Sequence, residues 1–429
     1  MSATTYNLRE EERVGTSTAG VPFAIGFYFA FRIMIVVLAV RLLGTDAQTG
    51  AEINLEFNFL LLILVAFVSL GEIRYPLSWM VRLPSVRWVL IFLAISCSSL
   101  AWTVAVSLPA AVAYWCAMAA DVAIVILLLR AGPLLHAAHS LMKGYVWGAC
   151  GVAAIAWVMP AQSDLRLGDE ELLGPNQIGY LCAFAFLFAQ LLMIKRDRGW
   201  RGPALMLALT VLRSLSKTTI LAFLAAQAFI LIRDRSMSRK SKIRISIAAG
   251  VAIVAFSSLL AAYYDMYTNA GNESETLTGR LGIWAYFLGE ALQRPWIGHG
   301  FHSAWKVIPP FGSDQFEARH AHNELLQQFY AYGALGVGIF IGIYGSFLRH
   351  IRRLEPGRLK TILYALLIFV LVRGIADTEA FDLSLPLWAI TMFALLIERE
   401  CAAGGEARVG VPREQVDLAG RPANLGSSE

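Results

Sequence analysis

The strongest constraint on the fold of this chain is a series of long apolar runs separated by polar connections. Runs of up to roughly 20 apolar residues lie at about 21–44, 54–71, 88–107, 110–130, 143–160 and 176–194, and again at about 202–213, 217–232, 244–263, 324–348, 360–376 and 384–398. A helix of about 20 residues crosses the hydrocarbon core of a bilayer. The runs therefore predict an all-α polytopic membrane bundle of about twelve transmembrane helices.

The composition excludes a set of soluble domains. Hydrophobic residues make up 57% of the 429 residues and charged residues only 16%, which is typical of one membrane domain with short loops. The net charge of +5 lies largely in loops, so we interpret it as a topology signal and expect no nucleic-acid partner. Four of the five cysteines fall in apolar runs, which predicts neither a disulfide nor a metal cluster.

The loops then sort by charge. Lysine and arginine gather in alternate connections, such as 195–201 and 233–244, which the positive-inside rule places in the cytoplasm. The expected order is a cytoplasmic tail (1–20), transmembrane helices 1–9 (21–263), a large periplasmic catalytic loop (264–323), transmembrane helices 10–12 (324–398) and a second cytoplasmic tail (399–429). The start of the chain lacks the features of a cleaved signal peptide, so we expect a bacterial inner-membrane protein with both termini inside.

One connection predicts a hairpin that does not cross the whole membrane. Both 195–198 and 233–235 are strongly basic, so the chain between them should cross an even number of times. Arg213-Ser-Leu-Ser-Lys217 interrupts this stretch and leaves two arms that are shorter than a full span. Charge at that depth survives beside protein or a water-filled cavity. The alternative is one long kinked helix with snorkelling cations.

Several cations lie on the outward side, where positive charge is otherwise avoided. They are Arg213, Lys217, Arg280 and Arg319, with Arg166 and Arg373 left without a role. After Arg280 the residues Leu281, Trp284, Leu288, Ala291 and Leu292 follow helical spacing, which predicts an amphipathic helix on the membrane surface. A cation in the first turn of a helix is poorly placed unless an anion is bound there. An ordinary solvated arginine is the alternative.

His322 is the strongest candidate for a general base. It precedes Asn323 and an apolar helix, at the border between water and membrane. The alternative is a structural hydrogen bonder. The spacings of His299, His302 and His320 could suggest zinc, but no acidic or cysteine partner stands nearby.

Two further sets of charged residues carry expectations. The carboxylates at 169–171 could be bases or metal ligands, or solvated loop acids. Arg32 and Asp121 lie at matching depths in the first and fourth runs, which predicts a structural ion pair inside the membrane.

The chain resembles the O-antigen ligase and polysaccharide polymerase family. The resemblance rests on the number of spans, on one large outer loop near the end, and on the ordered motifs Gly174-Pro175-Asn176, Ser216-Lys217-Thr218, Gly279-Arg280 … Trp284 … Pro295 … Gly298 … Gly300 and His322-Asn323 … Gly333 … Gly336. The Ser-Lys-Thr element and the sequence from Phe301 to Trp305 resemble the exopolysaccharide polymerase branch more than the lipid A-core ligases.

The resemblance implies a membrane glycosyltransferase that moves glycan from undecaprenyl diphosphate to an acceptor hydroxyl, without metal or cofactor and with inversion. His322 would be the base, and Lys217 and Arg280 would hold the diphosphate beside Arg213 and Arg319. Many ligases have arginine at the position of Lys217, and lysine lacks the bidentate geometry of arginine. The acceptor stays open between a second glycan chain and lipid A-core. The alternative function is that of a polysaccharide or glycolipid transporter, such as a flippase.

Overall fold

The computed structural model describes residues 20–71, 73–160, 162, 165–169, 172–195, 197–235, 237–259, 261–262, 265, 277–304, 320–377 and 384–409. Within these ranges the chain is nearly all helical and contains no strand, only an isolated bridge between Asp169 and Leu173. The all-α prediction is confirmed.

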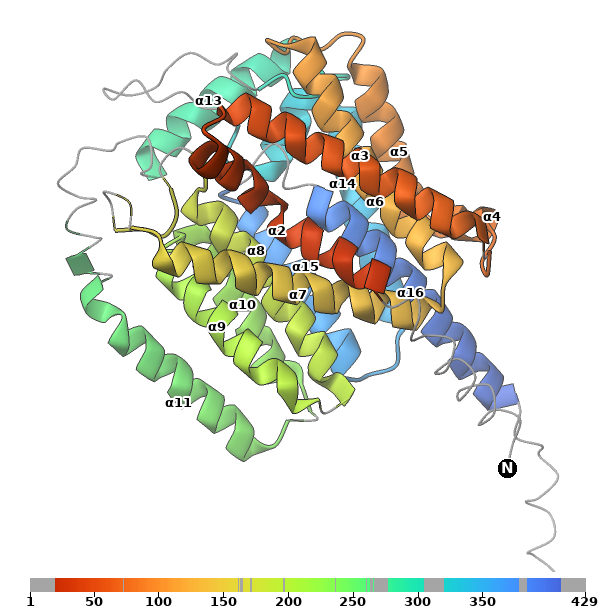
Figure 1. Cartoon of the computed structure of the whole chain (residues 1–429), viewed down its shortest axis with the longest axis vertical. Coiled ribbons are helices and arrows are strands. Elements are labelled where there is room, and N and C mark those ends of the chain that lie inside the picture. Colours follow the sequence, from red (N-terminus) through yellow and green to blue (C-terminus); the bar gives the residue numbers. More distant parts are fainter. Residues whose placement is uncertain are drawn as a thin grey trace, which may run out of the picture.

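Each predicted apolar run overlaps a helix (Figure 1). The helices are α2 (Gly20–Leu43), α3 (Ala47–Gly71), α4 (Leu77–Arg82), α5 (Pro84–Ser99), α6 (Leu108–Ala131), α7 (Leu134–Val158), α8 (Pro175–Leu192), α9 (Arg201–Arg213), α10 (Lys217–Arg233), α11 (Arg239–Ala255), α13 (Leu277–Gln293), α14 (Glu324–Arg353), α15 (Arg358–Gly374) and α16 (Ser384–Val409), with short 3-10 turns at Met193–Lys195 and Arg198–Trp200.

Six of the described helices are long and apolar enough to cross a membrane by length and composition: α2, α3, α6, α7, α8 and α14. Helix α5 is apolar but has only 16 residues. The several apolar helices make this a multi-pass membrane protein, while the count of twelve spans remains a prediction.

Helices α2 and α7 pack backbone against backbone. A Cβ atom added to Gly26 of α2 would lie 1.9 Å from the carbonyl oxygen of Leu141, and one added to Gly144 of α7 would lie 1.9 Å from that of Phe23. Small residues permit such close approach, which is a main source of helix association in membranes. The two glycines therefore let α2 and α7 lie in direct backbone contact.

The predicted ion pair between Arg32 and Asp121 is confirmed. Nη1 of Arg32 donates to both carboxylate oxygens of Asp121, at 2.9 and 2.7 Å. Asn58 of α3 donates to one of these oxygens at 3.1 Å, and the hydroxyl of Ser384 at the start of α16 donates to the other. The carboxylate is 1% exposed, and its network joins helices α2, α3, α6 and α16.

The two-armed connection is also confirmed. Helix α9 ends at Arg213 and α10 begins at Lys217, with arms of 13 and 17 residues. The chain turns through Leu215, which is buried and has a left-handed φ of 55°. A single long kinked helix is therefore excluded.

Helix α14 differs from the single span expected at 324–348. Gly333 interrupts it with a non-helical φ of 64° and ψ of −155°, so two helices meet at a kink. Glu324 before the kink and Tyr344 after it line one pocket, so the kink brings them together. The uninterrupted part of α14 begins only after Gly333, and the residues before it form a separate short helix.

The segment that follows α13 packs against the interrupted backbone of α14 at Gly333. A Cβ atom on Gly333 would lie 2.4 Å from the carbonyl carbon of Trp296, so only glycine permits this approach. The amide of Ala334 donates to the carbonyl of Pro295 at 2.7 Å. The motif residues Pro295 and Gly333 thus form one packing unit, which satisfies backbone groups that the kink releases.

The glycines of the same segment face the other side of the kink. The amide of His299 donates to Tyr330 at 3.0 Å and that of Gly300 to Ala331 at 2.8 Å. Gly298 has a φ of 62°, and a Cβ atom there would lie 2.4 Å from the carbonyl carbon of Ala331. These motif glycines have a structural role.

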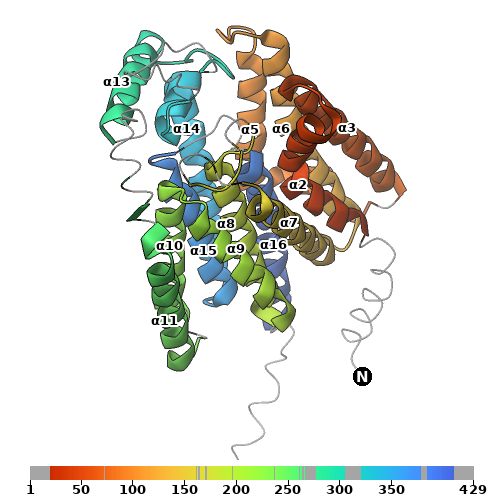
Figure 2. The same cartoon turned by 60° about the vertical axis from the view of Figure 1, so that its left-hand side comes forward.

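Helix α13 confirms the predicted helix after Arg280, but its buried face is different. Ile283, Phe287 and Ala291 are buried against the first part of α14. Leu281, Leu288 and Leu292, expected on one membrane-facing stripe with Ala291 and Trp284, are about half exposed. The helix therefore has two apolar sides. Figure 2 shows α13 at one end of the molecule, with the end of α16 at the other.

Candidate active site

The end of α15 meets the start of α14. The Asn323 side chain caps α14 by accepting from the amide of Leu326 at 3.0 Å, and its amide nitrogen donates to the carbonyl of Ile375 at 2.9 Å. Arg280 of α13 donates through Nη1 to the carbonyl of Ala376. Three elements that are distant in sequence therefore converge just after α15.

His322 and Asp377 face each other at this junction. Nδ1 of His322 lies 3.7 Å from Oδ1 of Asp377, a distance suited to a charge interaction but longer than a hydrogen bond. His322 has a left-handed φ of 48°, one of four such non-glycine residues in the described chain. Backbone strain of this kind costs free energy and is found at functional sites, where surrounding contacts fix it.

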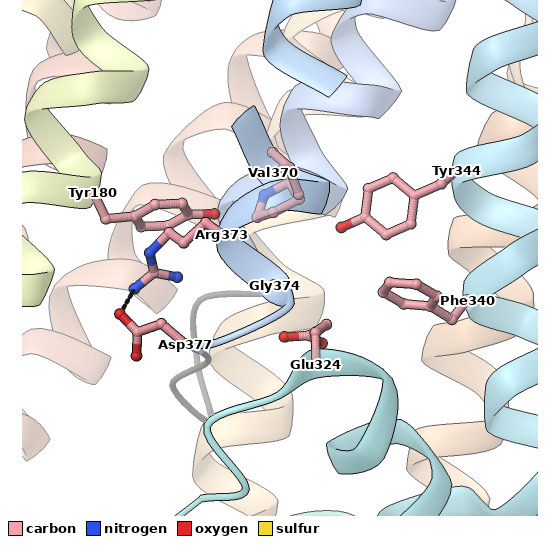
Figure 3. Close-up of a pocket in the computed structure, with 9 residues that line it drawn as sticks. Tyr180, Glu324, Phe340, Tyr344, Val370, Arg373, Gly374 and Asp377 are labelled. Carbon is pink, nitrogen blue, oxygen red and sulfur yellow. Dashed lines mark hydrogen bonds and ion pairs between the residues drawn. The ribbon is translucent and has the colours of Figure 1, made fainter. Parts of the chain in front are cut away.

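Asp377 is held by Arg373, one helical turn earlier. Nη2 of Arg373 lies 3.2 Å from Oδ2 of Asp377 (Figure 3). Both side chains are almost fully buried. The guanidinium also stacks on the ring of Tyr180 at 4.1 Å. Burial opposes ionisation of Asp377, but the positive charge of Arg373 and the contact with His322 outweigh it. The pKa of Asp377 therefore lies well below its usual range.

Lys217 begins α10, which packs antiparallel to α15. Phe229 contacts Tyr364, with ring centroids 6.1 Å apart, and Arg358 lies 3.8 Å from Asp234 near the opposite ends of the two helices. Following this register back along α10 brings Lys217 level with the end of α15, because both helices rise equally per residue.

Helix α8 contacts both the turn before Lys217 and the junction between α14 and α15. A Cβ atom on Gly179 would lie 2.9 Å from Oγ of Ser214 in that turn. The next residue, Tyr180, stacks on Arg373. The structure thus places Lys217, Arg280 and His322 around the end of α15.

The other predicted cations are placed differently. Nη1 of Arg213 donates to the carbonyl of Leu165 at 2.7 Å, so part of this guanidinium supports the loop between α7 and α8. Arg319 lies outside the described residues, as do Glu170 and Glu171. Asp169 forms an ion pair with Arg41, so the third member of this predicted cluster holds the C-terminal end of α2.

Two of the remaining histidines are packed in the interior. His299 stacks on Tyr330 with ring centroids 4.5 Å apart, and burial lowers its pKa. Burial also lowers the pKa of His302, beside Tyr114, to about 4. Among the described residues, no group of three or more potential metal ligands occurs.

His320 touches the candidate base directly. Its ring meets that of His322 edge-on, with centroids 4.1 Å apart. Burial, together with the charges of His322, Arg373 and Arg280, holds the pKa of His320 well below its usual range. His320 is therefore an uncharged side chain packed beside His322.

Asp377 was not predicted from the sequence, and Arg373 had no predicted role. A signal was present: an arginine and an aspartate four residues apart at the C-terminal end of an apolar run. The pairing of Asp377 with His322 carries no such local pattern.

Comparison with known proteins finds a family model that matches the middle of the chain. Residues 202–341 match the model of the O-antigen ligase family, a span that includes the hairpin, α13 and His322. In this segment the chain is similar to the O-antigen ligase family, which confirms the resemblance indicated by its motifs.

Two curated relatives point the same way. The exopolysaccharide production protein ExoQ of Rhizobium meliloti is 25% identical over 283 residues, which cover 59% of this chain and 62% of that protein. A protein named as a polysaccharide ligase in Rickettsia conorii is 25% identical over 131 residues, 28% of this chain and 32% of the relative. The chain thus matches less than two thirds of the length of either relative.

Proposed function

We propose that this protein is a glycosyltransferase that moves a glycan from undecaprenyl diphosphate to an acceptor hydroxyl at the outer face of the bacterial inner membrane. The observation that carries the proposal is the meeting of His322 with a buried, ionised Asp377, beside the cation Arg280. The matched family and the ExoQ relative favour polysaccharide synthesis over transport.

The proposed reaction is a direct displacement. The acceptor oxygen bonds to the anomeric carbon of the donor glycan while the bond from that carbon to the diphosphate oxygen breaks. The acceptor proton passes to His322, and undecaprenyl diphosphate leaves. One displacement inverts the anomeric centre and forms no covalent glycosyl-enzyme.

Asp377 has the role of an orienting carboxylate. Because Nδ1 of His322 faces Asp377, the other ring nitrogen, Nε2, is the one that takes the proton. A permanently ionised Asp377 stabilises the imidazolium that forms, as the aspartate of a catalytic triad does. Arg373 and Tyr180 keep the carboxylate in place.

Lys217 and Arg280 hold the diphosphate in this proposal, with Arg213 and Arg319 nearby and with no metal. Negative charge grows on the leaving group as the anomeric bond breaks, so fixed cations lower the barrier. The acceptor is either another glycan chain or lipid A-core. The orientation follows the positive-inside rule, with both termini in the cytoplasm and the loop at 264–323 in the periplasm.

Purified protein in proteoliposomes tests the proposal. Undecaprenyl-diphosphate oligosaccharide from host membranes serves as the donor, and the free oligosaccharide released from it by mild acid serves as the acceptor. We expect longer glycan products with inverted anomeric configuration, formed without added nucleotide or metal. Movement of lipid-linked glycan across the bilayer without any transfer product would instead establish a transporter.

A further inference from the structure

A pocket beside the His322–Asp377 pair has the chemistry of a sugar-binding subsite. It lies among α8, α14, α15 and α16, and Figure 3 shows the side chains that line it. Asp377 and Arg373 form one wall, and Glu324, Phe340 and Tyr344 of α14 form another. The pocket therefore adjoins the proposed reaction centre directly.

Glu324 is held in the lining of this pocket. It is the first residue of α14, directly after the capping residue Asn323, where the helix dipole favours a carboxylate. Gln328 donates to its Oε1 at 2.9 Å. A Cβ atom on Gly374 would lie 3.2 Å from that of Glu324, so the side chain packs closely over the end of α15.

The charge of the pocket argues against an anionic occupant. Its lining holds two carboxylates, Glu324 and Asp377, and one guanidinium, Arg373, which is committed to Asp377. The cations proposed for the diphosphate, Lys217 and Arg280, do not line it. The site thus divides into a cationic side and an acidic side.

Two aromatic side chains of α14 also line the pocket. Phe340 and Tyr344 contact each other with ring centroids 4.8 Å apart, and Figure 3 shows the hydroxyl of Tyr344 directed into the pocket. Carboxylates accept hydrogen bonds from hydroxyl groups, and ring faces offer apolar surface to their carbon skeleton. Neutral sugars present both kinds of surface.

We infer that Glu324 and Tyr344 bind a hydroxyl-bearing edge of the acceptor sugar and set the acceptor specificity. This inference rests on the proposed function for the identity of the acceptor. Glu324 accepts a hydrogen bond from an acceptor hydroxyl other than the attacking one, which places the attacking hydroxyl at His322. The subsite selects a neutral sugar and rejects one that carries a carboxylate or phosphate at that edge.

Glu324→Gln tests the inference, because it keeps the size of the side chain and removes the charge. The probe is the free oligosaccharide released by mild acid from the undecaprenyl-diphosphate glycan of host membranes. Its binding to the detergent-solubilised protein is measured by calorimetry, without any reaction. Transfer is measured separately, with donor and acceptor concentrations varied independently.

We expect Glu324→Gln to weaken binding of the free oligosaccharide and to raise the acceptor KM about tenfold, the loss of one hydrogen bond to a charged group. The donor KM should stay unchanged. Tyr344→Phe should give a smaller change in the same direction. Glu52→Gln is the matched control, because Glu52 also accepts a hydrogen bond from a glutamine one turn away, Gln48, but lies on α3, away from the pocket.

The outcomes separate the two proposals. Unchanged oligosaccharide binding in Glu324→Gln and Tyr344→Phe, or a change in donor KM alone, overturns the subsite. Wild-type protein that binds no free oligosaccharide overturns it as well. Binding that depends on Glu324 without any transfer supports the subsite and contradicts the proposed reaction.

Discussion

The molecule contains two buried pairs of arginine and aspartate that have different surroundings. Asp121 receives hydrogen bonds on both oxygens, from Arg32, Asn58 and Ser384. Asp377 is bonded through Oδ2 to Arg373, while its Oδ1 makes no hydrogen bond within the described residues and faces His322 at 3.7 Å. Both oxygens of Asp121 are therefore hydrogen-bonded, whereas Oδ1 of Asp377 can still interact with another group.

The difference indicates what each pair does. A buried charge whose hydrogen-bonding capacity is filled joins helices and has nothing left to offer a substrate. A buried carboxylate with one oxygen beside an imidazole can stabilise a proton that arrives there. We therefore expect changes at the first pair to affect folding and changes at the second to affect turnover.

The largest effect should come from Asp121→Ala. This change leaves Arg32 charged and without its partner inside the membrane, so the free energy of unfolding should fall by about 3–5 kcal/mol. Thermal unfolding in detergent measures the loss. Changing both residues to alanine should restore part of it, whereas additive losses would show that the pair is not coupled. Asp169→Ala is the control, because its partner Arg41 is half exposed and such pairs contribute about 1 kcal/mol or less.

The next effect concerns the cations beside the second pair. Lys217→Ala and Arg280→Ala should each raise the barrier to transfer by about 2–4 kcal/mol, by analogy with the loss of an oxyanion donor. Lys217→Arg should keep appreciable activity, because the charge remains. Exposed Arg294 at the end of α13 supplies the control variant Arg294→Ala. Near-normal turnover in both alanine variants would remove these cations from the site.

A smaller effect is expected for Asp377→Asn. Losing the carboxylate should cost about 1.5–3 kcal/mol of transition-state stabilisation, the range for hydrogen bonds to charged groups. The pKa of Asp377 is depressed, so the carboxylate stays ionised throughout the working pH range. The acid limb of the pH–rate profile therefore reports the base.

Asp377→Asn also predicts the direction in which that limb moves. Removing a neighbouring anion makes the imidazole harder to protonate, so activity should persist to lower pH in the variant. An unchanged acid limb would show that Asp377 does not act on His322, whatever the loss in rate.

The ion pair of Arg32 with Asp121, and the break in the chain near Arg213, could be predicted from the sequence. Arg32 and Asp121 are mid-span charges, which are costly in a membrane, so each requires a partner at the same depth. The break between Arg213 and Lys217 could be predicted because charge rules fix which ends face the cytoplasm. Both arguments need only distances along helices.

The candidate site around His322 and Asp377 could be predicted only in part. His322 and Arg280 were identified by motifs, but Asp377 was missed because its contact with His322 depends on how α14 meets α15. That meeting depends on the cap at Asn323 and on the kink at Gly333. Tertiary packing of this kind has no local sequence period, and the glycine motif gave no indication of a broken helix.

The most direct test of the account is transfer by His322→Ala. Removal of a general base costs about 10²–10⁴-fold in rate, so transfer should fall at least a hundredfold. The variant should still insert, unfold at the wild-type temperature and bind undecaprenyl-diphosphate glycan, because Lys217 and Arg280 are intact. Retention of more than about a tenth of wild-type transfer, below the smallest effect of a general base, would contradict the assignment of His322.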